Sequence, residues 1–294
     1  MTSCELPLSG NPKIDEGHRD DETRGFGTEM VSKLSQLGYR DLVHVHGGMD
    51  ARIYSAIAPD GRKVAIRIGA PFSRERWRNK VTWKNYVRMK LLTVVLPRHF
   101  NIIQYLRSGS LKLVGTGGDQ VSVFFLVMPF EEGKNLLQVL TDPAFKAGGL
   151  ARVYSTILGM LRGWVALHQR WLRHGDLTAP NFIIRKNTWE VVMVDLRFST
   201  RFLRTKDRTR NELRRTLRAL LTGTYLPRWQ REKELSPLSY DDVLAFWPTE
   251  NEKVAAYFRQ WADFAEGLED DDKLGKLTPP QLLAHAEKIA REQA

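Results

Sequence analysis

The chain has 294 residues, of which 42% are hydrophobic and 27% charged, and it carries a formal net charge of +11. This is the composition of an ordinary globular protein with room for a large core, and no apolar run approaches the ~20 residues that a membrane span requires. The single cysteine, Cys4, excludes an internal disulfide framework and a cysteine zinc cluster, so we expect a reducing, cytoplasmic location. The basic charge favours an anionic partner, such as a nucleotide, an acidic acceptor or a membrane surface contacted peripherally.

The first residues, 1–28, are polar and lack apolar periodicity and the features of a secretory signal, so we expect a flexible leader. After a short helix predicted over 29–37, three β-rich runs are expected at 41–45, 52–57 and 63–68. The turn Pro59-Asp60-Gly61 is a strong hairpin signal. In the preceding turn, backbone N–H groups at Gly47 and Gly48 can approach phosphates, although a glycine pair between strands is more often only a tight turn.

A basic helix is predicted over 73–96, with Pro97 at its end. From Gly61 to Arg107 the chain has 12 Lys/Arg and one Asp/Glu, a local excess of 12 − 1 = +11. Such a segment is either a solvated helix face or a docking surface for an anion. Interleaved aromatic residues also allow contact with nucleic acid, but we expect them to pack on a core instead.

A buried strand is predicted over 121–128, and Gly133 marks a linker. We therefore expect a first lobe over 29–130 and a second over 131–294, the second ending in a helical extension. Helices are predicted over 135–141, 150–171 and 212–221, and Thr249 with Glu252 predicts a capping box for a later helix.

The segment His174-Gly175-Asp176-Leu177-Thr178-Ala179-Pro180-Asn181 carries the chemistry. A predicted hairpin over 182–194 has Asn181 at its start and Asp195 at its end. Asp176 can accept a proton from an attacking hydroxyl, and Asn181 and Asp195 offer oxygen ligands to Mg²⁺, which together suit phosphoryl transfer. For His174 alone we expect a structural role as a satisfied core histidine.

Several short motifs in one order resemble the protein-kinase-like superfamily over about residues 40–225. H-G-D-L-T-A-P-N at 174–181 resembles the catalytic loop H-R-D-x-x-x-x-N, and V-D-L-R at 194–197 resembles the metal-binding D-F-G. V-A-I-R at 64–67 is similar to the third-strand V-A-I-K, and 127–131 is similar to the hinge. H-F-N-I-I at 99–103 and L-L-T-G at 220–223 match two further stretches in order.

The resemblance implies an α+β, two-lobed kinase-like fold with a small β-rich N-lobe and a mainly helical C-lobe. It implies ATP and Mg²⁺ as cofactors, catalytic roles for Asp176, Asn181 and Asp195, and metal binding by the last two. It also implies that one set of residues lines the nucleotide site: Gly47, Gly48, Ala51, Ala65, Arg67, Met128, Pro129 and Glu131.

The departures from the family pattern concern activity. Arg67 stands in place of the strand lysine, and no acidic residue occurs between Glu75 and Asp119, where the regulatory-helix glutamate belongs. The segment after Asp195 is short and lacks A-P-E, as in the atypical branch with RIO kinases, the KEOPS-complex kinase and lipopolysaccharide sugar kinases. A basic run follows: Arg201, Arg204, Lys206, Arg208, Arg210, Arg214, Arg215 and Arg218.

Three functions stay open. The first is an active phosphotransferase acting on a protein Ser/Thr or a sugar or lipid hydroxyl, with Asp176 as base. The second is a pseudokinase that binds a nucleotide or a protein partner without turnover. The third, nucleic-acid binding through the basic segments, is the weakest because no nucleic-acid-binding motif occurs.

Overall fold

The computed structural model of the protein describes residues 28–47, 51–69, 90–114, 120–172, 174, 176–196, 206–224, 238–268 and 274–292. These residues divide into two units. The first contains the described residues up to Lys90 together with 105–130, and the second contains 91–104 together with those from Glu131 onward. The predicted leader up to residue 27 and residues 73–89 of the predicted basic helix lie outside the described residues.

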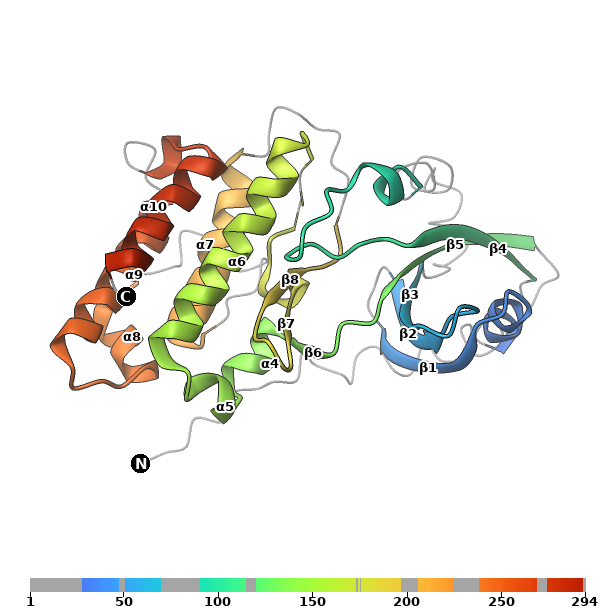
Figure 1. The fold of residues 1–294 in the computed structure, drawn as a ribbon, viewed down its shortest axis with the longest axis horizontal. Coiled ribbons are helices and arrows are strands. Elements are labelled where there is room, and N and C mark those ends of the chain that lie inside the picture. Colours follow the sequence, from blue (N-terminus) through green and yellow to red (C-terminus); the bar gives the residue numbers. More distant parts are fainter. Residues whose placement is uncertain are drawn as a thin grey trace. The chain divides into compact units, whose positions relative to one another are not determined.

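A five-stranded antiparallel sheet, in the order β1-β2-β3-β5-β4, forms the first unit (Figure 1). Four of its strands confirm the runs predicted at 41–45, 52–57, 63–68 and 121–128, each extended by one to three residues, and β4 is an additional strand. The strands are β1 (Arg40–Gly47), β2 (Ala51–Ile57), β3 (Lys63–Gly69), β4 (Arg107–Val114) and β5 (Gln120–Pro129). The predicted turn between β2 and β3 is also confirmed, with Gly61 at φ +83°, a conformation that glycine adopts without strain.

Side chains of β3 point alternately to the two faces of the sheet, and one of these faces contacts the apolar core. Val64, Ile66 and Ile68 are at most 1% exposed and belong to one apolar cluster. The helix over 28–36 adds Met30 and Leu34 to this cluster. Ala65 and Arg67 therefore lie on the other face of the sheet, since successive side chains of a strand point to opposite faces.

A small antiparallel sheet in the second unit has the order β6-β7-β8. Its strands are β6 (Gly133–Asn135), β7 (Phe182–Arg185) and β8 (Val191–Met193), and the last two confirm the predicted hairpin. The prediction that Gly133 marks a linker was wrong. Gly133 begins β6 and pairs with Arg185. A Cβ at Gly133 would lie 2.1 Å from the Ile184 carbonyl oxygen, so the close pairing of β6 with β7 requires glycine.

The second unit has a helical stretch over 91–95, and its other helices follow in chain order. They are α4 (Leu136–Leu140), α5 (Pro143–Lys146), α6 (Gly149–Gln169), η2 (Ala179–Asn181), α7 (Lys206–Thr222), α8 (Tyr240–Phe246), α9 (Glu252–Gly267), η4 (Leu274–Lys276) and α10 (Pro279–Glu292). The prediction of a capping box formed by Thr249 and Glu252 was wrong. Asn251 caps α9 instead, because its side chain accepts from the N–H groups of Lys253 and Val254. No helix in the described part of the chain is long and apolar enough to cross a bilayer.

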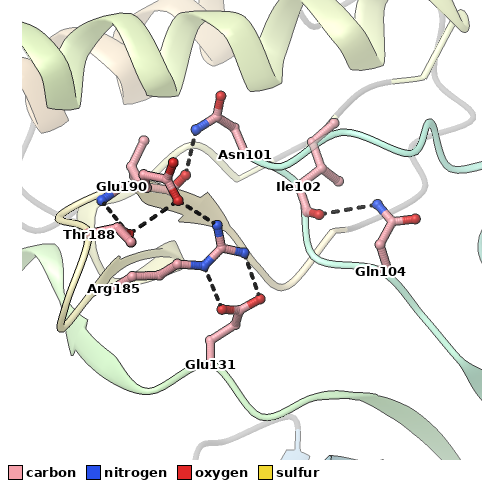
Figure 2. Close-up of polar contacts among 8 residues, drawn as sticks. Asn101, Ile102, Gln104, Glu131, Arg185, Thr188 and Glu190 are labelled. Atoms are coloured by element: carbon pink, nitrogen blue, oxygen red, sulfur yellow. Dashed lines mark hydrogen bonds and ion pairs between the residues drawn. The ribbon is translucent and has the colours of Figure 1, made fainter.

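Backbone bonds fix β8 from the side opposite β7. Met193 donates its N–H to the Asn101 carbonyl at 2.8 Å, and Ile103 donates to the Met193 carbonyl at 3.0 Å. The buried Asn101 side chain also donates to the Val191 carbonyl at 2.7 Å, as Figure 2 shows. Gly159 and Gly163 of α6 leave room for this segment, since a Cβ at either would lie 3.1 Å from an Asn101 atom. The strand leading to Asp195 is thus held on both edges.

Candidate active site

The β7–β8 hairpin brings Asn181 and Asp195 to its open end. Asn181 precedes the first residue of β7, and Asp195 follows β8 by two residues. The Val194 N–H donates to the Asn181 carbonyl at 2.8 Å, which continues the ladder by one step beyond the strands. Two residues 14 positions apart in the sequence (195 − 181 = 14) therefore flank the same end of one hairpin.

The Asn181 amide is oriented by the loop that contains Asp176. Its Nδ2 donates to the Asp176 carbonyl at 3.0 Å and lies 3.3 Å from the Thr178 hydroxyl. Because the amide nitrogen is used on this loop, the carbonyl oxygen Oδ1 is the atom that Asn181 offers to a cation.

Thr178 orients the Asp176 carboxylate. Its hydroxyl has one proton, which it donates to Asp176 Oδ1 at 3.1 Å, and the Thr178 residue is buried. Asn181, Thr178 and Asp176 therefore form one directed series of hydrogen bonds. A general base needs its carboxylate held in a fixed orientation toward the proton it removes, and this series supplies that restraint.

His174 connects the loop to the strand that leads to Asp195. It is fully buried, its Nδ1 accepts from the Asp176 N–H at 3.2 Å, and its Nε2 lies 2.8 Å from the Val194 carbonyl. Since Nδ1 accepts, the proton is on Nε2 and is donated to Val194. The expected structural role of His174 is confirmed, and its ring bridges the backbones next to both carboxylates.

Asp195 adopts a left-handed backbone conformation, with φ at +53°. Aspartate tolerates this region better than most residues, and such outliers concentrate at functional sites. Asp195 comes directly after Val194, whose N–H makes the last hydrogen bond of the hairpin ladder. Arg197, the last position of the motif that resembles D-F-G, lies outside the described residues.

Helix α7 holds the peptide groups of Leu177 from both sides. Glu212 accepts the Leu177 N–H at 2.9 Å, and the Thr216 hydroxyl donates to the Leu177 carbonyl at 2.7 Å. Both side chains are buried, and their spacing of four residues places them on one face of the helix. These two residues were missed by the sequence reasoning, because no local pattern connects them to a loop more than thirty residues earlier.

The structure describes only part of the basic run after Asp195. Residues 201–205 and the side chains of 206–208 lie outside the described part of the chain. Within α7, Arg214 and Arg215 are buried, Arg214 pairs with Glu266, and Arg210 donates to the Leu277 carbonyl. The guanidinium groups of Arg210 and Arg214 therefore join α7 to segments that follow it.

Four of the predicted nucleotide-site residues share one face of the first unit's sheet. Ala65 pairs with Met128 across β3 and β5, and Ala51 pairs with Gly69 across β2 and β3. Directly paired residues lie on the same face, so Ala51, Ala65, Arg67 and Met128 all lie opposite the apolar cluster. Pro129 pairs with Val64 and lies on the core face, Gly47 pairs with Arg52 in β1 and β2, and Gly48 lies outside the described residues.

Glu131, also predicted at the nucleotide site, has its carboxylate in an ion-pair network of the second unit (Figure 2). Arg185 donates from Nε to one Glu131 oxygen at 2.8 Å and from Nη2 to the other at 3.0 Å, and its Nη1 donates to Glu190 at 3.1 Å. The Thr188 hydroxyl donates to the same Glu190 oxygen. The hydrogen bonds from Arg185 to Glu131 raise the pKa of Arg185 above its ordinary value. The nucleotide contact of Glu131 stays a prediction.

The donor set of the second unit fits Mg²⁺ bound together with phosphate. Among the described residues, no group of three or more His, Cys, Asp or Glu side chains could hold a metal by itself. Mg²⁺ in nucleotide sites takes only one or two protein oxygens and fills its shell with phosphate and water. An amide oxygen at Asn181 and a carboxylate at Asp195 meet that need.

The sheet unit, the helical unit and the loop between α6 and β7 together define a protein-kinase-like fold. The pseudokinase domain of BIR2, an immune regulator of the RLK/Pelle family, matches 92% of this chain and 94% of that domain at 14% identity, with a TM-score of 0.61. The pseudokinase DRIK1, a drought responsive inactive kinase, matches 84% and 89% at 13% identity, with a TM-score of 0.58. The PknI kinase domain of Mycobacterium tuberculosis matches 86% and 96% at 16% identity, with a TM-score of 0.54.

These likenesses confirm the predicted fold class, with a β-sheet lobe and a mainly helical lobe. No protein-family model and no curated protein sequence matches the chain. At these identities the likeness concerns the fold, so the activity has to be argued from the residues themselves.

Proposed function

We propose that the chain is an ATP- and Mg²⁺-dependent phosphotransferase that moves the γ-phosphoryl group of ATP to a hydroxyl acceptor. Asp176 accepts the proton of that hydroxyl, and Asn181 and Asp195 hold the metal. Phosphoryl transfer requires mainly positioning and charge neutralisation, so one oriented carboxylate and two oxygen ligands are sufficient protein chemistry in the second unit.

The hydrogen bond from Asn181 Nδ2 to the Asp176 carbonyl is the observation that carries the proposal. It couples a metal-ligand residue to the residue that acts as base, and the His174 bridge couples both to the backbone before Asp195. One amide and two carboxylates in this arrangement are the groups that a base and two Mg²⁺ ligands require.

The first unit contributes nucleotide-binding groups in this proposal. Arg67 takes the place of the phosphate-binding lysine, with its charge but a planar rather than a point geometry. Ala51, Ala65 and Met128 supply the small and apolar surface beside it, and Pro129 offers only its carbonyl to the adenine. Since Arg185 holds the Glu131 carboxylate, Glu131 contributes through its main chain.

The acceptor belongs to one of two chemical classes, a protein serine or threonine or a sugar or lipid hydroxyl. The net charge of +11 favours an acceptor that carries negative charge close to the hydroxyl. The same basic charge is compatible with a protein partner that carries negative charge.

A second candidate is a pseudokinase that binds nucleotide without turnover. Arg67 in place of lysine favours it, and two of the similar structures, those of BIR2 and DRIK1, are described as pseudokinases. The two candidates share the fold and the nucleotide and differ only in whether the γ-phosphoryl group leaves.

The test is ATP consumption by the purified full chain with Mg²⁺ and with EDTA, together with calorimetric binding of ATP. We expect Asp176→Asn to lower kcat by about 10² to 10⁴, the usual contribution of a general base, with ATP binding retained. Asp195→Asn should remove the Mg²⁺ dependence of binding. Asp60→Asn, in the exposed turn between β2 and β3, is the matched control and should leave both measurements unchanged.

The outcomes separate the candidates. Binding of ATP without consumption in the presence of protein, sugar and lipid acceptors would establish the pseudokinase and refute the phosphotransferase. Consumption that Asp176→Asn leaves unaltered would also refute it, because the proton would then have another acceptor.

A further inference from the structure

The turn after α6 presents a tryptophan to solvent in a strained conformation. Trp171 donates its N–H to the His168 carbonyl at 2.9 Å, and Leu172 donates to the Leu167 carbonyl at 2.9 Å. These two bonds terminate α6 in the way that normally places glycine at the left-handed position. Trp171 occupies this position with φ at +57°, and 84% of it is exposed.

Trp171 differs from the other residues in the left-handed conformation, because neither its residue type nor its packing explains that conformation. Among the described residues, four that are not glycine have positive φ, and two of them, Asp41 and Asp195, are aspartates, which tolerate the conformation. The third, Trp189, is half-buried, and its ring packs 4.0 Å from the Arg152 guanidinium and 6.0 Å from the Phe145 ring. Trp189 therefore gains packing that offsets its strain, whereas Trp171 leaves its indole ring in water.

The sequence around Trp171 is basic. Arg170 is exposed immediately before it, and the sequence has Arg173 two residues after it. No acidic residue occurs between Asp142 and Asp176, a stretch that includes the whole of α6. The only charged side chains that this stretch contributes are therefore cationic.

From these observations we infer that the turn at Trp171 is a docking surface for an anionic lipid bilayer. An indole ring has an apolar body and a polar N–H, and it binds at the level of the lipid headgroups. Arg170, adjacent to Trp171 in the chain, and the net charge of +11 on the whole chain add attraction to an anionic surface.

A bilayer suits this site better than a protein pocket for two reasons. The ring projects from the end of a helix with 84% exposure, and a soft planar surface accepts such a projection without a complementary cavity. The charged side chains of residues 143–175, the stretch that contains α6 and this turn, are also all cationic, which matches a negatively charged surface. A protein partner is the alternative occupant that the experiment separates.

The experiment measures sedimentation of the full chain with vesicles of phosphatidylcholine alone and of phosphatidylcholine mixed equally with phosphatidylglycerol. We expect the wild type to bind the anionic vesicles at least about tenfold more tightly, with the difference reduced by salt. Trp171→Gly should weaken this binding by about tenfold, while Trp171→Phe retains most of it. Brominated lipid should quench more fluorescence in the wild type than in Trp171→Phe.

Two controls isolate the role of the ring. Val43→Thr alters an exposed apolar residue of β1, 59% exposed, and should bind vesicles as the wild type does. Trp171→Gly should melt at the same or a higher temperature than the wild type, because glycine relieves the left-handed strain, whereas Trp189→Gly should melt lower. A loss of vesicle binding by Trp171→Gly is then not a loss of folding.

The inference is overturned if Trp171→Gly binds anionic vesicles as tightly as the wild type, or if the wild type binds neutral vesicles equally well. It is also overturned if the wild type binds neither kind of vesicle, in which case the exposed ring serves a protein partner.

Discussion

Thr216→Val removes one hydroxyl from the contact between α7 and the loop that contains Asp176. The Thr216 side chain is fully buried, and its hydroxyl is 2.7 Å from the Leu177 carbonyl and 3.0 Å from the Glu212 carbonyl. Valine has the same shape but no donor, so the Leu177 oxygen loses a partner away from water. Leaving such a group unsatisfied costs about 2 kcal/mol. For a unit of this size that is a fall in melting temperature of about 4–8 °C.

Turnover should fall as well, because Leu177 adjoins Asp176. We expect about a tenfold lower kcat with an unchanged KM for ATP, since a small displacement of a catalytic group affects the reaction more than binding. Thr216→Ser is the control: it keeps the hydroxyl and loses a methyl group, so it should lower stability by about 1 kcal/mol with normal kcat.

The assay for this series is calorimetric melting combined with steady-state ATP consumption. A Thr216→Val chain with the melting temperature and kcat of the wild type would refute the reasoning. So would a Thr216→Ser chain whose kcat falls as far as that of Thr216→Val, because the hydroxyl would then not be the group that matters.

Three further changes test other parts of the second unit. Arg185→Lys replaces the two hydrogen bonds to Glu131 with a single one, so the free energy of unfolding from denaturant titration should fall by about 1 kcal/mol. An unchanged free energy of unfolding would mean that the pair is not formed in solution. Gly133→Ala places a Cβ against the Ile184 carbonyl and should destabilise by about 2 kcal/mol; normal melting would contradict the β6 register. Burial lowers the pKa of His99 below 6.5, so the unfolded state binds more protons just below that pH and wild-type stability falls there as pH drops. His99→Gln should therefore lose less stability between about pH 7.5 and about pH 5.5, and an equal loss would exclude this contribution.

The sequence was most informative where the pattern is local. β-rich runs predicted four strands of the first unit, and Asp60-Gly61 predicted the turn between two of them, because both signals depend on neighbours in the chain. The order of short motifs predicted the kinase-like fold, although each motif is weak alone. The placement of Asn181 and Asp195 at one end of a hairpin followed from the same local signals.

Contacts between distant segments could not be predicted in this way. The bond from Leu177 to Glu212 spans 35 residues and the pair of Glu131 with Arg185 spans 54. Which partner a carboxylate finds across such distances depends on how strands and helices pack. Glu131 illustrates this, because its position in a motif indicated a nucleotide while its carboxylate is held by an arginine of β7.

The end of α6 was misplaced for a related reason. Apolar periodicity carried the predicted helix to residue 171, because no glycine or proline interrupts the pattern there. The helix instead ends at Gln169. Trp171 occupies the left-handed position after the helix, where glycine is usually found.

The most direct test of the proposed site is a structure of the chain with Mg²⁺ and a non-hydrolysable ATP analogue. Asn181 Oδ1 and an Asp195 carboxylate oxygen should each lie about 2.1 Å from the metal, the distance that Mg²⁺ requires of oxygen ligands. A nucleotide whose metal is held only by phosphate and water, with both side chains turned away, would contradict the account.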